Sequence, residues 1–297
     1  MSDLPTGPIP KVGARRHRRR RPVRTLLIGV VAVAVVGGLA YGGVRLLAST
    51  IADSGTDPAP SGSDASPDTG LLPGAPTPTP QPSVKAATVS GVGYDVSYPQ
   101  CRSALPASAA FGIVGLNGGA PLLSNRCFAD QVAWARRTGA YAIYINTAYS
   151  GVGEPVAYGR RLAEDAIKRE RAAGVSGIGM WWLDVELTNT WKGTQRENAT
   201  VIAAMAARLQ QAGVRVGIYS SPDQWVEIAG DYSPGLPVWN AIGTGTQAQA
   251  LASCDEEFAG SASAIVQWVA KRGSSLIDHN LICPAYKHRA GEILVVR

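Results

Sequence analysis

The chain has 297 residues, of which 45% are hydrophobic, and a formal net charge of +6. This length allows one large domain or two small ones. The charge does not indicate a nucleic-acid-binding surface, because residues 1–50 carry nine Lys or Arg and one Asp, whereas residues 88–297 carry 18 basic and 17 acidic residues. We therefore expect no nucleic-acid partner.

The N-terminal segment has the pattern of a membrane anchor. Residues 11–24 form a dense basic run, and residues 25–44 follow as an uncharged apolar run. About 20 apolar residues, at about 1.5 Å each, span a hydrocarbon core of about 30 Å. A cleaved signal peptide, whose apolar region is typically about 7–15 residues, remains the alternative. The pattern predicts a cytoplasmic arm over 1–24 and a single transmembrane signal anchor over 25–48, with the remainder extracytoplasmic by the positive-inside rule.

Residues 49–88 are rich in Pro, Ser and Thr and lack the apolar content of a core. The alternating prolines of residues 75–82 favour extended polyproline II. At about 3.1 Å per residue, such a disordered linker could reach on the order of 100 Å from a membrane. It suits a domain that works in a cell wall, although a spacer without a preferred target has the same composition. The folded domain is expected over 89–297.

All four cysteines lie in the exported part of the chain, which predicts two disulfides. Three pairings are possible. The pairing of Cys101 with Cys127 and Cys254 with Cys283 closes the shortest loops and is favoured.

The folded domain alternates strand-like and helix-like segments. The short apolar segments typical of covered parallel strands are 91–97, 111–117, 140–146, 177–186, 214–221, 236–242, 263–269 and 292–297. Helical patterns fill 128–138, 155–173 and 194–212. Eight such units in about 209 residues predict an α/β fold, a compact and irregular TIM-like barrel. A doubly wound open sheet is the alternative.

Four acids are candidates for catalysis. Asp184 and Glu186 share one face of a strand and come at its carboxyl end, where barrels of this class place their active sites. Asp95 ends the first strand in the same way, and Asp278 precedes the last. Mutual repulsion at one mouth should raise at least one pKa, as glycoside hydrolysis requires of its acid. A single Asp at a strand end can instead cap a loop.

Aromatic side chains are expected around the same mouth, where flat rings with a polar edge suit sugar faces. The candidates for substrate contact are Tyr94, Tyr149, Trp182, Tyr219, Trp239 and Trp268. Neither a calcium loop of the EF-hand type nor an HExxH-like zinc spacing occurs, so no metal or other cofactor is expected.

Several motifs occur in an order that resembles a known family. They are "GYDVSYPQ" (Gly93–Gln100), "WWLDVE" (Trp181–Glu186), "GIYSSPDQW" (Gly217–Trp225), "PVWNA" (Pro237–Ala241), "VQW" (Val266–Trp268) and "IDHN" (Ile277–Asn280). Together they resemble the family 25 glycoside hydrolases, the lysozyme-type muramidases. The resemblance implies an irregular (β/α)5(β)3 barrel that cleaves the β-1,4 bond between N-acetylmuramic acid and N-acetylglucosamine in peptidoglycan. By position it implies that Glu186 is the general acid/base, that Asp184 is its partner, and that Asp95 and Asp278 support them.

The sequence also departs from that family near the expected groove. Asn117 stands where the family often has an acidic strand end, which makes it a further candidate for substrate contact. With the predicted anchor, the resemblance points to a monomeric, membrane-anchored wall hydrolase, and the high Ala, Gly, Arg and Pro content is in keeping with a high-GC actinobacterium. The alternative is a non-catalytic glycan-binding or structural envelope domain on the same barrel.

Overall fold

The structure is a computed structural model that describes residues 84, 86–272 and 275–297. The predicted arm, the predicted anchor and nearly all of the predicted linker lie outside the described residues. Within the described ranges, no helix has both the length and the apolar character needed to cross a membrane.

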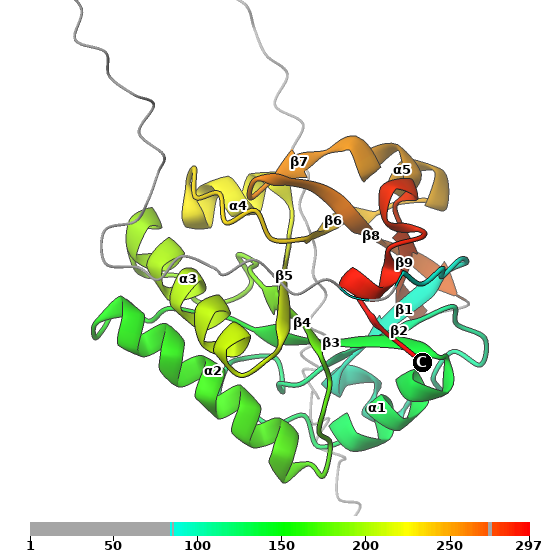
Figure 1. Cartoon of the computed structure of the whole chain (residues 1–297), viewed down its shortest axis with the longest axis horizontal. Helices are drawn as coiled ribbons and strands as arrows, with labels where there is room; N and C mark the ends of the chain where they lie inside the picture. Colours follow the sequence, from blue (N-terminus) through cyan, green and yellow to red (C-terminus); the bar gives the residue numbers. More distant parts are fainter. Residues whose placement is uncertain (1–83, 85, 273–274) are drawn as a thin grey trace, which may run out of the picture. The chain divides into compact units, whose positions relative to one another are not determined.

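Strands and helices alternate along most of the described chain, and three strands follow one another near its end (Figure 1). The strands are β1 (Gly93–Val96), β2 (Gly112–Gly115), β3 (Ala140–Asn146), β4 (Met180–Asp184), β5 (Arg215–Ser220), β6 (Val238–Thr244), β7 (Glu257–Phe258), β8 (Ser261–Arg272), β9 (Ser275–Ile282) and β10 (Val295–Val296). The α-helices are α1 (Phe128–Arg137), α2 (Pro155–Ala172), α3 (Gln195–Gln211), α4 (Pro222–Ala229) and α5 (Gln247–Ala252). The 3-10 helices are η1 (Tyr98–Arg102), η2 (Ser253–Asp255), η3 (Pro284–Tyr286) and η4 (Ala290–Glu292).

Eight strands close into a barrel. The ring runs β3-β2-β1-β9-β8-β6-β5-β4, and β4 pairs back to β3. All neighbouring strands in the ring are parallel except β9, which is antiparallel to both β8 and β1. Helices or a 3-10 helix follow each of the first five strands, and α2 and α3 lie side by side outside β4 and β5 (Figure 1). The predicted barrel is confirmed, and the open doubly wound sheet is excluded.

One predicted strand was misplaced. The eighth strand of the ring is β9, not the predicted 292–297, of which only β10 is a strand. β10 lies outside the ring and pairs with the beginning of β3 through Val295 and Tyr141. The centre of β9 is polar, with Asp278, His279 and Asn280 in succession, so it does not look like a buried strand in the sequence.

The three predicted helices are found to within one residue at each end. Helix α3 begins as its sequence predicts, because the Thr194 hydroxyl accepts from the Glu197 backbone N–H while the Glu197 carboxylate accepts from the Thr194 backbone N–H at 2.8 Å. Helix α4 was not predicted. Its signal is Ser221 as the N-cap followed by Pro222 at the first helical position.

The barrel interior is filled by aromatic and aliphatic side chains. Trp182 and Trp239 are 0% and 1% exposed and meet edge to face, with ring centroids 5.8 Å apart. Gly217 makes room for this layer, because a Cβ there would lie 2.3 Å from the Trp182 ring. A Gly217→Ala substitution would therefore overpack the barrel core, a change that typically costs about 1–3 kcal/mol.

The two predicted disulfides are present and connect loops to the barrel. Cys101–Cys127 joins the segment after β1 to the start of α1, and Cys254–Cys283 joins η2 to the end of β9. The described residues contain no free cysteine. The first disulfide therefore fastens two loops that follow the carboxyl ends of β1 and β2.

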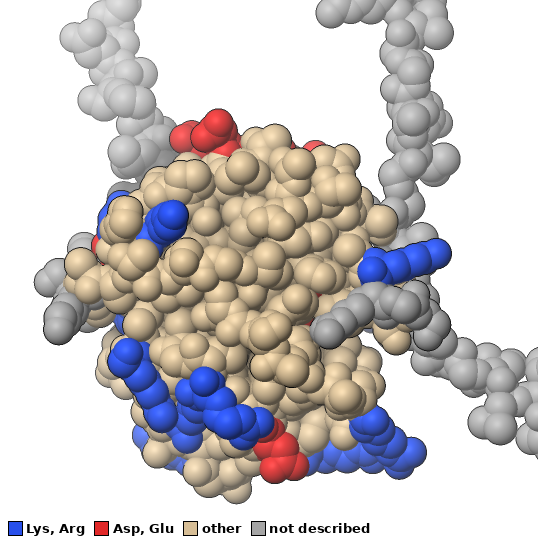
Figure 2. Space-filling view, turned by 90° about the vertical axis from the view of Figure 1, so that its right-hand side faces the viewer, with Lys and Arg blue, Asp and Glu red and all other residues tan. Residues whose placement is uncertain are grey.

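Charge is distributed unevenly over the domain. Figure 2 shows a face that is largely uncharged, with acidic side chains at its upper edge and Lys and Arg side chains gathered toward its lower edge. Residues 216–270 include six acidic residues and no Lys or Arg, whereas α2 alone carries five basic residues. None of the three ion pairs in the described part of the chain involves the four predicted catalytic acids.

Candidate active site

The four predicted acids meet at one end of the barrel. Asp184 is the last residue of β4, Glu186 follows it, and Asp95 is the third residue of β1. Asp278 lies within β9 rather than before the last strand. The four carboxyls are close enough to interact, because the charge of Glu186 raises the pKa of Asp95, Asp184 and Asp278.

Asp184 is the most enclosed member of the strand pair, at 4% exposure. The Asn146 side chain donates to its Oδ2, and the Asn189 side chain donates to its Oδ1 at 3.1 Å. Burial raises the pKa of Asp184 well above its usual range, the charge of Glu186 raises it further, and the two amide donors oppose that shift. Each carboxylate oxygen therefore has its own fixed donor.

Glu186 is more accessible than Asp184 and lies in the turn after β4. Its backbone carbonyl accepts from the Trp191 indole N–H at 3.0 Å. Burial raises the pKa of the Glu186 carboxyl, while hydrogen bonds from the side chains of Tyr219, Thr188 and Asp184 lower it. The Thr188 hydroxyl is 3.3 Å from Oε2. A partly exposed carboxyl beside a buried one has the arrangement of an acid that reaches a ligand.

The turn that carries Glu186 is held by the neighbouring strand. The Val185 backbone N–H donates to the Tyr219 carbonyl at 2.9 Å, and the Ser220 hydroxyl donates to the Val185 carbonyl at 2.7 Å. Val185 itself is fully buried. The apolar residue between the two acids therefore anchors the strand end and keeps Asp184 and Glu186 on the same side.

Asp95 is buried and receives two amide donors on one oxygen. The Gln267 side chain donates to its Oδ2 at 3.0 Å, and the Asn280 side chain donates to the same Oδ2 at 2.7 Å. Burial, the largest effect, raises the pKa of Asp95 to about 6 against the two amide bonds that lower it, and the charge of Glu186 adds to the rise. In a substantial fraction of the molecules, Asp95 is thus protonated near pH 6.

Asp278 has a different environment. Across the described residues, its carboxyl accepts no hydrogen bond from any side chain or backbone group. Burial raises its pKa well above the usual range, and the charges of Asp95 and Glu186 raise it further. Of the four mouth acids, it alone receives no hydrogen bond from the part of the chain that the structure describes.

Among the predicted aromatic contacts, Tyr219 belongs to the mouth. Its hydroxyl donates to Gln267 Oε1 at 2.9 Å and also interacts with the Glu186 carboxylate. Trp182 and Trp239 lie in the closed barrel interior, which corrects the expectation that they are open to a ligand. The Trp239 indole donates to Asn280 Oδ1 at 2.8 Å, and Asn280 in turn donates to Asp95, so Trp239 holds a residue that contacts one of the acids.

Three other predicted contacts do not open into the mouth, which corrects the expectation that they are available to a ligand: two face outward from the barrel and one is buried. Tyr94 and Trp268 alternate with inward-facing Asp95 and Gln267, so they face outward and pack on either side of the His279 ring, with centroids 5.0 and 5.2 Å from it. Tyr149 is 2% exposed and donates its hydroxyl to the Gly153 carbonyl at 2.7 Å.

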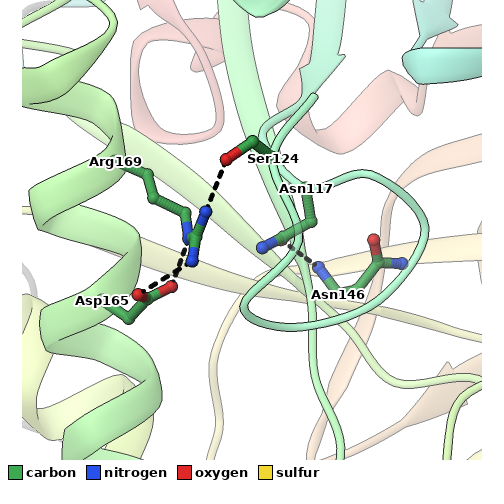
Figure 3. A network of polar contacts seen from close by, with 5 residues as sticks. All are labelled: Asn117, Ser124, Asn146, Asp165 and Arg169. Atoms are coloured by element: carbon green, nitrogen blue, oxygen red, sulfur yellow. Dashed lines mark hydrogen bonds and ion pairs between the residues drawn. The ribbon is translucent and has the colours of Figure 1, made fainter. Parts of the chain in front are cut away.

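Asn117 is buried, at 4% exposure, and its Oδ1 accepts from the Asn146 backbone N–H at 2.9 Å (Figure 3). It therefore fixes the residue whose side chain donates to Asp184, instead of presenting its own amide to a ligand. The loop after Asn117 is fastened to α2, because the Arg169 guanidinium donates to the Ser124 hydroxyl at 2.6 Å and to Asp165 Oδ1 at 3.1 Å (Figure 3).

Several site residues were missed from the sequence. The side chains that hold the acids are those of Asn146, Asn189, Gln267 and Asn280. Tyr144, inside the barrel, has its pKa raised by burial first and then by the charges of Asp95, Asp184 and Asp278. One signal was available: Asn146 ends β3 at the position that registers with Asp184 in β4.

Comparison with known proteins identifies a lysozyme-like region. A family model described as "Lysozyme-like protein 1" matches residues 132–265, a range that contains Asp184 and Glu186. The chain is 38% identical over 74 residues to the probable GH family 25 lysozyme 4 of Dictyostelium discoideum, which is 24% of this chain and 34% of that protein. A second protein of that organism, probable GH family 25 lysozyme 2, is 38% identical over 68 residues, 22% of this chain and 32% of its own. The chain thus spans about a third of the length of these relatives.

Solved structures share the fold. A muramidase from Trichobolus zukalii aligns with a TM-score of 0.51 at 18% identity, over 69% of this chain and 99% of its own. The CTP1L endolysin aligns with a TM-score of 0.51 at 12% identity, over 68% of this chain and 70% of its own. The barrel therefore has the fold of these muramidase and endolysin structures, and its central part, residues 132–265, is similar in sequence to lysozyme-like proteins.

Proposed function

We propose that this lysozyme-like domain is a glycoside hydrolase that cleaves the β-1,4 bond between N-acetylmuramic acid and N-acetylglucosamine in peptidoglycan. The observation that carries the proposal is the Asp184–Glu186 pair at the barrel mouth, one acid buried and the other partly exposed. The sequence match to lysozymes supports it, because the matched range contains both acids.

The accessibility of its carboxyl favours Glu186 as the proton donor of the pair. The amide donors Asn146 and Asn189 each stabilise one oxygen of an ionised Asp184. The two neighbouring carboxyls repel each other and are joined by a hydrogen bond, so they titrate as a pair that shares a proton. Glu186 has the more accessible carboxyl of the two, so the shared proton reaches a ligand from Glu186.

In the proposed reaction, Glu186 transfers its proton to the glycosidic oxygen as the bond from that oxygen to the anomeric carbon breaks. The ionised Asp184 stabilises the positive charge that develops at the sugar. A water supplies the hydroxyl that ends on the anomeric carbon and returns a proton to Glu186. Assistance by the substrate's own N-acetyl group is compatible with this arrangement, with Asp184 orienting that group.

We propose in addition that the domain acts outside the cell membrane, tethered by an anchor over 25–48 and the Pro-rich linker. This proposal depends on the sequence pattern alone, as do the monomeric state and the actinobacterial type of source.

The test uses the full chain and purified peptidoglycan, with new reducing ends as the readout. Wild type should release reducing ends, and Glu186→Gln should lose at least about 10²-fold, the usual contribution of a general acid. Glu164→Gln is the matched control, because Glu164 lies on the surface of α2 in an ion pair with Arg208. Equal release by wild type and Glu186→Gln would contradict the proposal. Retention of the chain on intact wall without release would favour the glycan-binding alternative.

A further inference from the structure

We infer that Asp95 and Asp278 form a carboxyl pair that shares one proton, which is seated on Oδ1 of Asp95, and that Gln267 and Asn280 position it there. This pair is a property of the barrel mouth and does not require that the domain hydrolyse glycan.

The strand register brings the two carboxyls together. β1 and β9 are antiparallel, and Tyr94 pairs with His279. The same register sets Asp95 opposite Asp278, where directly opposed side chains have Cβ atoms about 4.5–5.5 Å apart. Asn280 faces the barrel interior, because it donates to Asp95, and Asp278 lies two residues away on the same face. Both carboxyls therefore point into the mouth from neighbouring strands.

The amide orientations are fixed by their other partners. The Trp239 indole is a donor only, so Asn280 must offer it an oxygen and turn its NH2 toward Asp95. Gln267 accepts the Tyr219 hydroxyl on its Oε1, which turns its own NH2 toward Asp95. Both side-chain amide donors converge on Oδ2 of Asp95, and neither of them occupies Oδ1. A proton on Asp95 can therefore reside on Oδ1 without displacing either amide.

Asp278 supplies the acceptor for that proton. Its carboxyl has no hydrogen bond from any described residue, although it is largely enclosed. Two ionised carboxyls that face each other in a buried site repel strongly, and one retained proton relieves the repulsion and satisfies both groups.

The groups around the pair favour keeping the proton. Glu186 and Asp184 from the β4 end add negative charge, and the phenols of Tyr144 on β3 and Tyr219 on β5 are neutral. The nearest imidazole, His279, faces the outer side of the wall between two aromatic rings. None of the ion pairs in the described segments brings a cation to the mouth.

A singly protonated pair offers a ligand both a donor and an acceptor. It also keeps one negative charge, instead of two, on the side of the mouth that faces the Asp184–Glu186 pair. We therefore assign Gln267 and Asn280 as positioning residues that act through Asp95.

The direct test is a ¹³C NMR titration of the aspartate carboxyl carbons in the full chain. In wild type, the signals of Asp95 and Asp278 should each move in two shared steps more than about one pH unit apart, as coupled sites do. In Asp278→Asn, Asp95 should titrate in one step at lower pH. Asp130→Asn, on the exposed side of α1, is the control that should change neither signal. Single independent steps for Asp95 and Asp278, unaffected by the partner's substitution, would overturn the pair.

Urea unfolding of two variants at two pH values tests the shared proton independently of the titration. Asp95→Asn keeps an oxygen that can accept from the two amides, and its NH2 takes the place of the shared proton, so the variant should fold. The difference in the free energy of unfolding between this variant and wild type should favour the variant more at pH 8 than at pH 5. Asp278→Asn should show the same trend, because it removes the opposed charge. If the difference between the variant and wild-type urea midpoints is the same at pH 5 and pH 8, the shared proton is contradicted.

Discussion

The two sides of the barrel mouth hold their acids in different ways. On the β4 side, Asp184 has one amide donor on each oxygen and an accessible neighbour, Glu186. On the β1–β9 side, both amide donors of Asp95 converge on one oxygen, and its neighbour Asp278 has no donor among the described residues. The first arrangement stabilises an anion beside a proton that can leave, and the second encloses a proton between two carboxyls. The placement of amide donors, more than the number of acids, therefore distinguishes the two pairs.

Removing the charge on the β4 side should have the largest effect. Asp184→Asn should lower peptidoglycan hydrolysis by about 10²–10³-fold, because preorganised charge near the reacting sugar is lost. In this variant Glu186 no longer titrates together with a second carboxyl, so the alkaline limb of the remaining pH profile should move. Asp165→Asn, in a surface ion pair with Arg169, is the matched control. A profile that does not move would contradict the pairing of Asp184 with Glu186.

The pH dependence of stability tests both sides together. The pKa of Asp95 is raised from 3.8 to about 6, and those of Asp184, Glu186 and Asp278 are also raised. A group with a raised folded-state pKa stabilises the protein fully below its unfolded pKa and loses this contribution as the pH rises through the folded value. For Asp95 alone the loss is about 3 kcal/mol between about pH 3.8 and pH 6, and roughly half of it falls above pH 5. Urea unfolding should therefore give a larger free energy at pH 5 than at pH 8, and an increase toward pH 8 would contradict the raised values.

Removing a single amide donor from the β4 side should have a moderate effect. Asn146→Ala should lower the free energy of unfolding by about 1–3 kcal/mol at pH 8, because a buried ionised oxygen loses its donor. Asn189→Ala removes the donor of the other oxygen and should behave in the same way. Both losses should be smaller at pH 5, where the pair binds more protons. Chemical denaturation at the two pH values measures this, and equal losses at both would contradict an ionised Asp184.

The smallest expected effects come from removing the hydroxyl of either of two buried tyrosines. Tyr219→Phe and Tyr149→Phe should each cost about 1 kcal/mol, since each removes one hydrogen bond. Only Tyr219→Phe should change the activity profile, because the Tyr219 hydroxyl lowers the pKa of Glu186. Its loss should shift the alkaline limb of activity to higher pH. An identical shift in Tyr149→Phe would show that the effect comes from stability.

Much of the fold could be predicted from the sequence, because its strands and helices have strong patterns. The apolar run to Asp184 identified β4, and the spacing of Thr194 and Glu197 identified the start of α3. Strand β9 was missed because its inward-facing residues are the polar ones that complete the mouth. The residue types that make β9 functional are those that remove its strand pattern.

The site was predictable in its acids and not in their surroundings. The acids occur at strand ends, where the fold class places chemistry, so their positions have a sequence signal. The donors Asn146 and Gln267 are single amides on separate strands, and no spacing joins them before the barrel closes. The aromatic contacts were overassigned, because the face on which Tyr94 or Trp268 lies depends on register, and their neighbours Asp95 and Gln267 have the inward positions.

The central claim is that the Asp184–Glu186 pair delivers a proton to one particular glycosidic bond. Its most direct test is to digest peptidoglycan with the full chain, reduce the soluble fragments with borohydride and identify the sugar at the reducing end by mass spectrometry. The proposed bond cleavage predicts reduced N-acetylmuramic acid at the new ends with wild type, and none with Glu186→Gln. Reduced N-acetylglucosamine at those ends, or the same fragments from Glu186→Gln, would contradict it.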